Sequence, residues 1–264
     1  MAKLNYNIHG EGEPLIVLHG LFGSGRNWNS VAKELARHRQ VITLDLRNHG
    51  DSKHTDTMTY ADMAGDIEWL MAELGLHSAA LLGHSMGGKV AMAFALSQPK
   101  RTDALMVADI APVEYRFTFT GFIDAMLSLP VDEIRNRGDA DEWLREAGIK
   151  DDMVRAFLLQ SLVRHDGAYA WQLNLPVLQE YMQELASFPS DWPVHHYDGP
   201  VRFLAAGESD YLQPRYYPVI SELFPEADVR TIEGAGHWLH ADKPETFVRE
   251  VRDFLTEASP ASKQ

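Results

Sequence analysis

A serine in a glycine-rich turn is the first residue of this chain whose surroundings suggest chemistry. Gly83-His84-Ser85-Met86-Gly87 matches the G-x-S-x-G pattern; the apolar run Ala79–Leu82 precedes it and the small, apolar stretch Lys89–Leu96 follows it. A sharp turn from a strand into a helix exposes the serine hydroxyl, and glycines without a Cβ let the two elements approach. We therefore predict that Ser85 is the nucleophile of a serine hydrolase.

A serine hydroxyl becomes a good nucleophile only when a base takes its proton. Of the 12 histidines, His237 lies in the glycine-rich segment Gly234-Ala235-Gly236-His237-Trp238. This segment falls between the last predicted strand and the last predicted helix, so it returns the chain to the sheet edge that carries Ser85. We predict His237 as the base, whereas His19 and His240 are expected to be structural.

The oxyanion that forms when the serine attacks needs N–H donors that are held in place. One donor is expected from Met86, the residue after the nucleophile. The other is expected from the turn that follows the first apolar run, His19-Gly20-Leu21-Phe22-Gly23. Within this turn we favour Leu21, with Phe22 as the alternative.

The charge and the cysteine content exclude several other classes of protein. Lys and Arg number 24 and Asp and Glu 38, a net charge of −14, whereas nucleic-acid binding needs clustered basic residues. The chain has no cysteine, which excludes a disulfide scaffold and a cysteine nucleophile. We find no signal peptide and no apolar run of the roughly 18 residues that span a membrane. These features predict a soluble, cytoplasmic protein without a nucleic-acid partner.

Short apolar runs alternate with helical patterns through most of the chain, which predicts an α/β fold. Such alternation builds βαβ units and therefore a mostly parallel sheet. The expected strands are Leu15–Leu18, Val41–Leu44, Ala79–Leu82, Ala104–Ala108, Val201–Ala205 and Asp228–Ile232, and the expected helices include Tyr60–Leu74, Pro214–Leu223 and Pro244–Leu255.

Residues 113–196 break this alternation, so we expect a helical insertion in one core made of residues 1–112 and 197–264. Long insertions in compact domains are usually functional, and a lid over the active site is the favoured interpretation. The expected helices lie near Thr118–Leu129, Asp141–Ala147, Met153–Leu162 and Pro176–Leu185. Some of the aromatic side chains of the insertion are expected to face the site; these aromatic residues include Trp143, Tyr169, Trp171, Tyr181 and Phe188.

Several motifs together resemble one family of small hydrolases. They are His19–Ser24, Asp45–Gly50, Gly83–Lys89, Asp109–Pro112 and Gly234–Trp238. Over essentially its whole length the chain is similar to the YbfF-type bacterial esterases and their mitochondrial relatives among the abhydrolase-domain proteins. The resemblance implies an α/β-hydrolase fold with helices on both faces of the sheet, catalysis by Ser85 and His237 without a cofactor or metal, and a lid formed by the insertion.

Two aspartates compete for the third position of the triad. Asp210 follows the strand Val201–Ala205, where most α/β-hydrolases carry the acid. In the YbfF-type branch this site often lacks an acid and has a serine in or beside it, here Ser209, and the carboxylate comes from the D-I-A-P segment, here Asp109. Asp109 also ends an apolar strand, so its carboxylate needs a partner such as a charged His237. We favour Asp109 and keep Asp210 as the alternative.

The sequence therefore predicts a serine hydrolase that cleaves small carboxylic esters and, by resemblance, acyl-CoA thioesters. A C–C bond hydrolase or a cofactor-free perhydrolase on the same fold is one alternative. Epoxide hydrolases and dehalogenases use an aspartate nucleophile, so Ser85 disfavours both. A non-catalytic ligand receptor is another alternative, although such proteins usually lose the serine or the histidine. The physiological substrate and the oligomeric state do not follow from the sequence.

Overall fold

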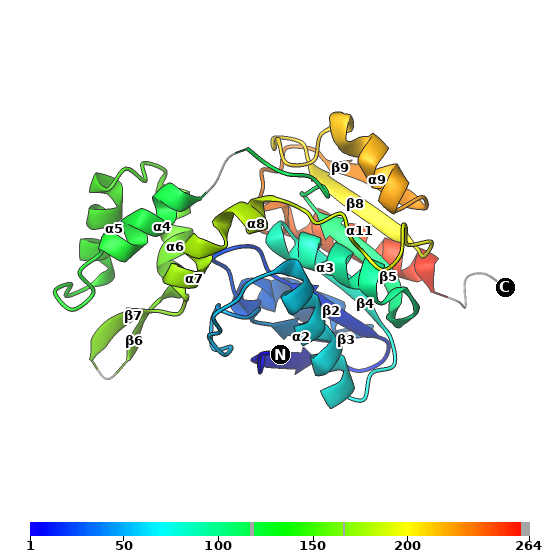
Figure 1. Cartoon of the computed structure of the whole chain (residues 1–264), viewed down its shortest axis with the longest axis horizontal. Helices are drawn as coiled ribbons and strands as arrows, with labels where there is room; N and C mark the ends of the chain where they lie inside the picture. Colours follow the sequence, from blue (N-terminus) through cyan, green and yellow to red (C-terminus); the bar gives the residue numbers. More distant parts are fainter. Residues whose placement is uncertain (117–118, 166, 260–264) are drawn as a thin grey trace.

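A twisted parallel sheet forms the centre of the molecule. The computed structural model describes residues 1–116, 119–165 and 167–259. Within them, seven strands pair in the order β1-β3-β2-β4-β5-β8-β9, and all pairs except β1 with β3 are parallel (Figure 1). The strands are β1 (Tyr6–His9), β2 (Pro14–Leu18), β3 (Gln40–Leu44), β4 (Ala79–His84), β5 (Thr102–Ala108), β8 (Val201–Ala206) and β9 (Ala227–Ile232). The predicted mostly parallel sheet is confirmed.

Both faces of the sheet are covered by helices, which explains the uninterrupted apolar runs of its strands. In β2, Ile16 and Leu18 belong to one core cluster and Leu15 and Val17 to the other. The first cluster includes residues of α2 (Tyr60–Glu73), α3 (Met86–Ser97) and α9 (Tyr217–Leu223). The second includes residues of α1 (Asn29–Leu35) and α11 (Pro244–Ala258).

Strand β1 was not predicted, because it carries little of the signal that marks a buried strand. It lies at the edge of the sheet and pairs antiparallel with β3, with Tyr6 opposite Leu44. Asn7 and Ile8 are exposed, and Tyr6 and His9 are half-buried. An edge strand of this kind needs no continuous apolar run, so its existence depends on the neighbour that pairs with it.

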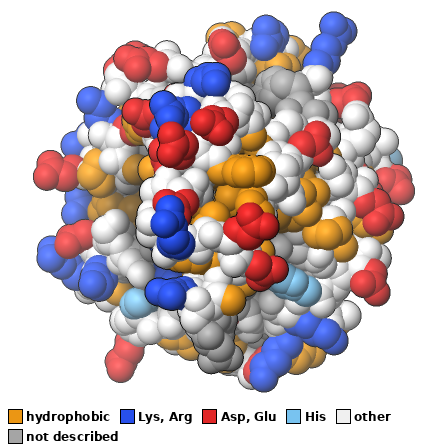
Figure 2. Space-filling view, turned by 90° about the vertical axis from the view of Figure 1, so that its left-hand side faces the viewer, with side chains coloured by type: hydrophobic (Ala, Val, Ile, Leu, Met, Phe, Trp, Pro, Cys, Tyr) orange, Lys and Arg blue, Asp and Glu red, His pale blue; other side chains and the backbone are white. Residues whose placement is uncertain are grey.

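The segment between β5 and β8, residues 113–196, is an insertion that lies beside the sheet at one end of the molecule (Figure 1). Its helices are α4 (Thr120–Ser128), α5 (Arg137–Glu146), α6 (Asp152–Leu158), α7 (Leu175–Glu180) and α8 (Met182–Ala186). The expected first helix included Thr118, which lies outside the described residues. The outward end of the molecule carries basic and acidic side chains around a group of hydrophobic ones (Figure 2).

The prediction that the insertion is entirely helical is wrong. Strands β6 (Leu162–His165) and β7 (Ala168–Trp171) form an antiparallel hairpin with Leu162 opposite Trp171. Helix α6 ends at Leu158 rather than at Leu162. Each strand has only four residues, too few for a clear alternation of apolar and polar positions. The sequence signal that was overlooked is the Asp-Gly pair at 166–167, which is favoured in short hairpin connections.

No helix within the described residues is long and apolar enough to cross a membrane.

Candidate active site

Ser85 occupies a strained turn between β4 and α3. Its φ of 53° and ψ of −122° lie outside the regions that residues with a side chain ordinarily adopt. Its N–H donates to Ala108 O at 3.0 Å, which ties the turn to the end of β5. A Cβ on Gly83 would lie 2.1 Å from Gly87 O, and a Cβ on Gly87 would lie 2.4 Å from Leu18 O. Only glycine fits at both positions, as the motif predicted.

The ring of His237 is paired with the carboxylate of Asp109. His237 lies between β9 and α10 (Leu239–Asp242), and its Nδ1 is 2.8 Å from Asp109 Oδ2. The Asp109 side chain is fully buried and that of His237 is 21% exposed. Ser85 and His237 line the same cleft. The topology thus brings together three residues from the ends of β4, β5 and β9, at the carboxyl edge of the sheet.

The buried carboxylate of Asp109 has two further partners. Oδ1 accepts the N–H of Ala206 at 3.1 Å, and Oδ2 accepts the hydroxyl of Ser209 at 2.5 Å. A buried carboxylate is tolerated only when it is paired and hydrogen-bonded. These bonds, both from the end of β8 and the turn that follows it, hold the carboxylate toward His237.

Asp210 has a different environment. It is exposed, and its carboxylate accepts a long hydrogen bond of 3.4 Å from Gln213 Nε2 within the same turn. Of the two aspartates that the sequence left as candidates, the one that the structure places on His237 is Asp109.

Two rings that the sequence analysis did not select pack against His237. Tyr211 stacks on it, with ring centroids 4.0 Å apart and an interplanar angle of 23°. The ring of His84 lies 4.7 Å away, and its Nε2–H donates to the main-chain oxygen of His237 at 2.7 Å. Burial, with smaller contributions from His237 and His240, holds the pKa of His84 well below its usual range, so His84 is neutral. Both rings are next to predicted residues, Tyr211 after Asp210 and His84 before Ser85.

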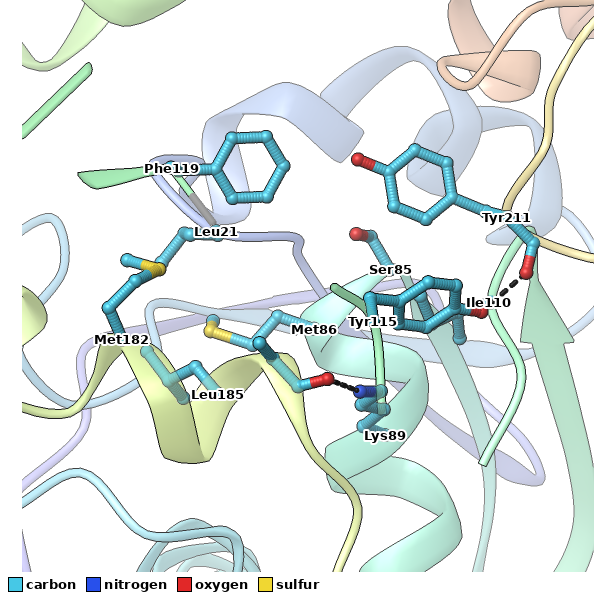
Figure 3. Close-up of a pocket in the computed structure, with 11 residues that line it drawn as sticks. Leu21, Ser85, Met86, Lys89, Ile110, Tyr115, Phe119, Met182, Leu185 and Tyr211 are labelled. Carbon is cyan, nitrogen blue, oxygen red and sulfur yellow. Dashed lines mark hydrogen bonds between the residues drawn. The ribbon is translucent and has the colours of Figure 1, made fainter. Parts of the chain in front are cut away.

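The turn after β2 meets Ser85 from the other side. Leu21 and Met86 line a pocket together with Ser85 (Figure 3). Met86 is the first residue of α3, so its N–H has no partner within the helix. The N–H of Phe22 donates to His49 Nε2 at 3.2 Å. Because the Phe22 N–H is used in this bond, Leu21 is the residue of the turn that fits the predicted role of oxyanion donor.

Three buried histidines support these turns. His19 Nε2 accepts the N–H of Leu46 at 2.9 Å, and its Nδ1–H donates to Gly20 O. His49 donates through Nδ1 to Arg47 O, and burial, reinforced by His19, lowers its pKa to about 3. His240 stacks on Trp28 with ring centroids 4.4 Å apart. His19 and His240 therefore have the surroundings expected of structural residues.

Two cavities, a pocket and a cleft, meet at Ser85. One is a small pocket of about 40 Å³, more enclosed than the other and called the closed pocket below, bounded by Ile110, Phe119, Met182 and Leu185 (Figure 3). The other is an open cleft of about 680 Å³ between the core and the insertion, lined by His237, Trp238, Phe122 and several residues of α6 that include Phe157. The insertion thus forms one wall of the cleft.

Some aromatic residues of the insertion line these two cavities, as expected, but they are not the five that the sequence analysis named. They are Tyr115, Phe119, Phe122 and Phe157. Trp171 instead donates its indole N–H to Met126 O, and Phe188 packs against Tyr60 and Trp192. The expectation fails for Trp143, Tyr169, Trp171, Tyr181 and Phe188, because which face of a short helix meets the core depends on packing that its sequence does not specify.

Lys89 joins α3 to both ends of the insertion. Its buried ammonium donates to Val113 O at 2.9 Å, to Ala186 O at 2.9 Å and to Ser187 O at 2.6 Å. The ring of Tyr115 lies 4.9 Å from the ammonium. Burial lowers the pKa of Lys89 to about 7, which the charge of Glu114 partly opposes. The three N–H bonds are thus used to fasten the segments that leave and rejoin the core.

Among the described residues, no three His, Asp or Glu side chains gather in a way that could hold a metal ion. The predicted independence of any cofactor stays a prediction.

The fold and this arrangement of serine, histidine and aspartate define a class, and comparison with known proteins identifies it. Residues 13–244 match the model of the alpha/beta hydrolase fold family, so the chain belongs to this family. It is 42% identical over 269 residues to the sn-1-specific diacylglycerol lipase ABHD11 of Xenopus laevis, covering 98% of this chain and 85% of that protein.

A second relative is the esterase YbfF of Escherichia coli, which is 34% identical over 257 residues, with 97% of this chain and 98% of that protein covered. Among solved structures, a marine microorganism esterase superposes with a TM-score of 0.93 at 38% identity and covers 96% of this chain and all of that one. The predicted relation to YbfF-type esterases and mitochondrial abhydrolase-domain proteins is confirmed. The chain is a hydrolase of the α/β type.

Proposed function

We propose that this hydrolase cleaves carboxylic esters through a triad of Ser85, His237 and Asp109. The observation that carries the proposal is the 2.8 Å contact between His237 Nδ1 and the buried Asp109 carboxylate, at the edge of the sheet where Ser85 sits in its strained turn. The relatives named esterase and lipase support an ester substrate.

In the proposed mechanism, Asp109 fixes the His237 ring with its proton on Nδ1, which leaves Nε2 free to act as a base. His237 takes the proton of the Ser85 hydroxyl as its oxygen attacks the ester carbonyl. The N–H groups of Leu21 and Met86 stabilise the oxyanion. His237 then returns the proton to the leaving alcohol, and an acyl group remains on Ser85. Water activated by the same ring releases the acid.

The buried position of Asp109 suits this task. When His237 becomes an imidazolium, an ionised partner in a site shielded from water stabilises it more strongly than an exposed one would. The hydrogen bonds from Ala206 and Ser209 keep the carboxylate oriented throughout the cycle. We further propose that the insertion acts as a lid, since it forms a wall of the cleft that contains Ser85 and His237. Activity on acyl-CoA thioesters and a cytoplasmic location stay predictions.

The proposal is tested with p-nitrophenyl butyrate and the Ser85→Ala variant. We expect measurable hydrolysis by the wild type and a loss of at least about a thousandfold in the variant. A fluorophosphonate should form an adduct that peptide mass spectrometry locates on Ser85. Hydrolysis that survives in Ser85→Ala would contradict the proposed nucleophile. An intact, folded wild type that neither hydrolyses the ester nor forms the adduct would favour the receptor alternative.

A further inference from the structure

The two cavities that meet at Ser85 differ in their relation to His237. The closed pocket is lined by Ser85 and by both residues proposed to hold the oxyanion, Leu21 and Met86. The open cleft shares Ser85 and Leu21 and is lined in addition by His237. In acyl transfer the histidine must give its proton to the leaving group, so the leaving group has to lie on the side of the histidine. The acyl chain then extends into the other cavity.

We infer that the closed pocket is the acyl subsite and restricts the enzyme to esters of short acids, while the open cleft accepts bulky apolar alcohols. This inference rests on the proposed function. The volume of the closed pocket is about 40 Å³, and a water molecule needs about 10–15 Å³ measured in this way. The pocket thus has room for about three or four groups of the size of a water molecule, which suits acyl chains no longer than about butyryl. The cleft, at about 680 Å³, has no such restriction.

The far wall of the pocket is formed by α8. Met182 and Leu185 project into it, and Phe119 closes the side next to Leu21 (Figure 3). Met182 and Leu185 are 4% and 7% exposed as residues, so the wall is packed against the core. A chain longer than the pocket would collide with these two side chains rather than pass into solvent.

Lys89 keeps this wall in place. Its ammonium is bonded to the main-chain oxygens of Ala186 and Ser187, directly after Leu185, and to Val113 at the other end of the insertion. Figure 3 shows Lys89 below the pocket, with one of these bonds running to α8. Main-chain carbonyls cannot rotate out of the way as a side chain can, so α8 cannot retreat without breaking these buried hydrogen bonds. The pocket is therefore expected to keep its length when substrate binds.

The test measures kcat/KM of the wild type on p-nitrophenyl acetate, butyrate, hexanoate and octanoate. We expect the highest values on acetate and butyrate and a value at least about tenfold lower on octanoate, since one or two surplus methylenes in a closed pocket cost about tenfold or more. A wild type that hydrolyses octanoate as fast as butyrate would overturn the inference and leave the proposed function intact. A wild type that hydrolyses none of the four esters would overturn the proposed function, and this inference with it.

Two variants change the pocket in opposite directions. Leu185→Ala should raise the octanoate-to-butyrate ratio of kcat/KM about tenfold, and Ala186→Leu should lower the butyrate-to-acetate ratio by a similar factor. The matched control is Leu178→Ala, which truncates a fully buried leucine of the neighbouring helix α7 and should leave both ratios unchanged. If Leu185→Ala fails to fold, Ala186→Leu and the wild-type profile still decide. Ratios that shift equally in the control would contradict the inference.

Discussion

The turns after β5 and β8 lie side by side at the carboxyl edge of the sheet, and each carries an aspartate. Asp109 begins the first and is fully buried, with bonds to His237, Ser209 and Ala206. Asp210 lies in the second, is exposed, and is bonded to Gln213 of its own turn. The difference teaches that the position of a carboxylate along the chain matters less than the groups that desolvate and orient it.

The second turn still contributes to the site, through other side chains. Ser209 donates its hydroxyl to the same oxygen of Asp109 that meets His237, and Tyr211 stacks on the His237 ring. The hydroxyl of Tyr115 bonds to the main-chain oxygen of Tyr211, which ties this turn to the start of the insertion. The turn after β5 therefore supplies the Asp109 carboxylate, and the turn after β8 holds this carboxylate and the His237 ring in place.

The largest effect is expected from Asp109→Asn. The amide has nearly the same shape but cannot stabilise an imidazolium, and it favours the wrong tautomer of His237, so kcat should fall by about a thousandfold to ten-thousandfold. Steady-state hydrolysis of p-nitrophenyl butyrate measures the loss, and circular dichroism checks the fold. A fall of less than about tenfold in a folded variant would remove Asp109 from the triad.

A smaller effect is expected from Ser209→Ala. It removes one of the bonds that orient the Asp109 carboxylate and leaves the bond from Ala206. A hydrogen bond to a charged group is worth about 1.5 kcal/mol or more, so we expect kcat to fall about tenfold. Ser209→Thr keeps a hydroxyl and should recover most of the activity. Equal losses in both variants would show that the hydroxyl is not the feature that matters.

Loss of the Tyr211 ring that stacks on His237 should lower kcat less than loss of the Ser209 hydroxyl does. Tyr211→Leu retains apolar volume but removes the aromatic contact, which is worth about 0.5–1.5 kcal/mol beyond its buried area. We expect kcat to fall roughly threefold to tenfold, with KM nearly unchanged. Tyr211→Phe preserves the stack and should lie closer to the wild type than Tyr211→Leu does. The reverse order would assign the effect to the hydroxyl rather than to the ring.

The smallest effect is expected from Asp210→Asn. The side chain is exposed and its bond to Gln213 stays within its own turn, so kcat/KM should stay within about twofold of the wild type, as for most surface substitutions. This variant is the matched control for Asp109→Asn, because both replace one carboxylate by an amide in adjacent turns. A large loss here would make the second turn the source of the triad acid.

The sequence predicted those parts of the site that depend on local structure. The turn at Ser85 follows from a buried run, a glycine motif and a helix, all within about 20 residues, and the structure has this turn as predicted. The choice between Asp109 and Asp210 could not be made in this way. It depends on which turn points its carboxylate inward, and that is decided by the register of β5 against β8, pairing Ala108 with Leu204.

In the insertion, even more of the structure depends on contacts between distant residues, which local sequence does not predict. Its helices were predicted from apolar spacing, but the hairpin of β6 and β7 was missed and the aromatic residues that reach the site were misassigned. Short elements carry weak periodicity, and the insertion is positioned by contacts with distant residues. The three bonds of Lys89 to main-chain oxygens are an example, because the residues around Val113 and Ala186 carry no sequence signal that predicts them.

The most direct test of the central claim compares how fast Ser85 is labelled in two variants. The rate at which a fluorophosphonate modifies Ser85 reports the activation of the nucleophile itself, without product release or acyl-enzyme hydrolysis. We predict that Asp210→Asn reacts at the wild-type rate and that Asp109→Asn reacts at least about a hundredfold more slowly. Slow labelling of Asp210→Asn together with wild-type labelling of Asp109→Asn would contradict a triad of Ser85, His237 and Asp109.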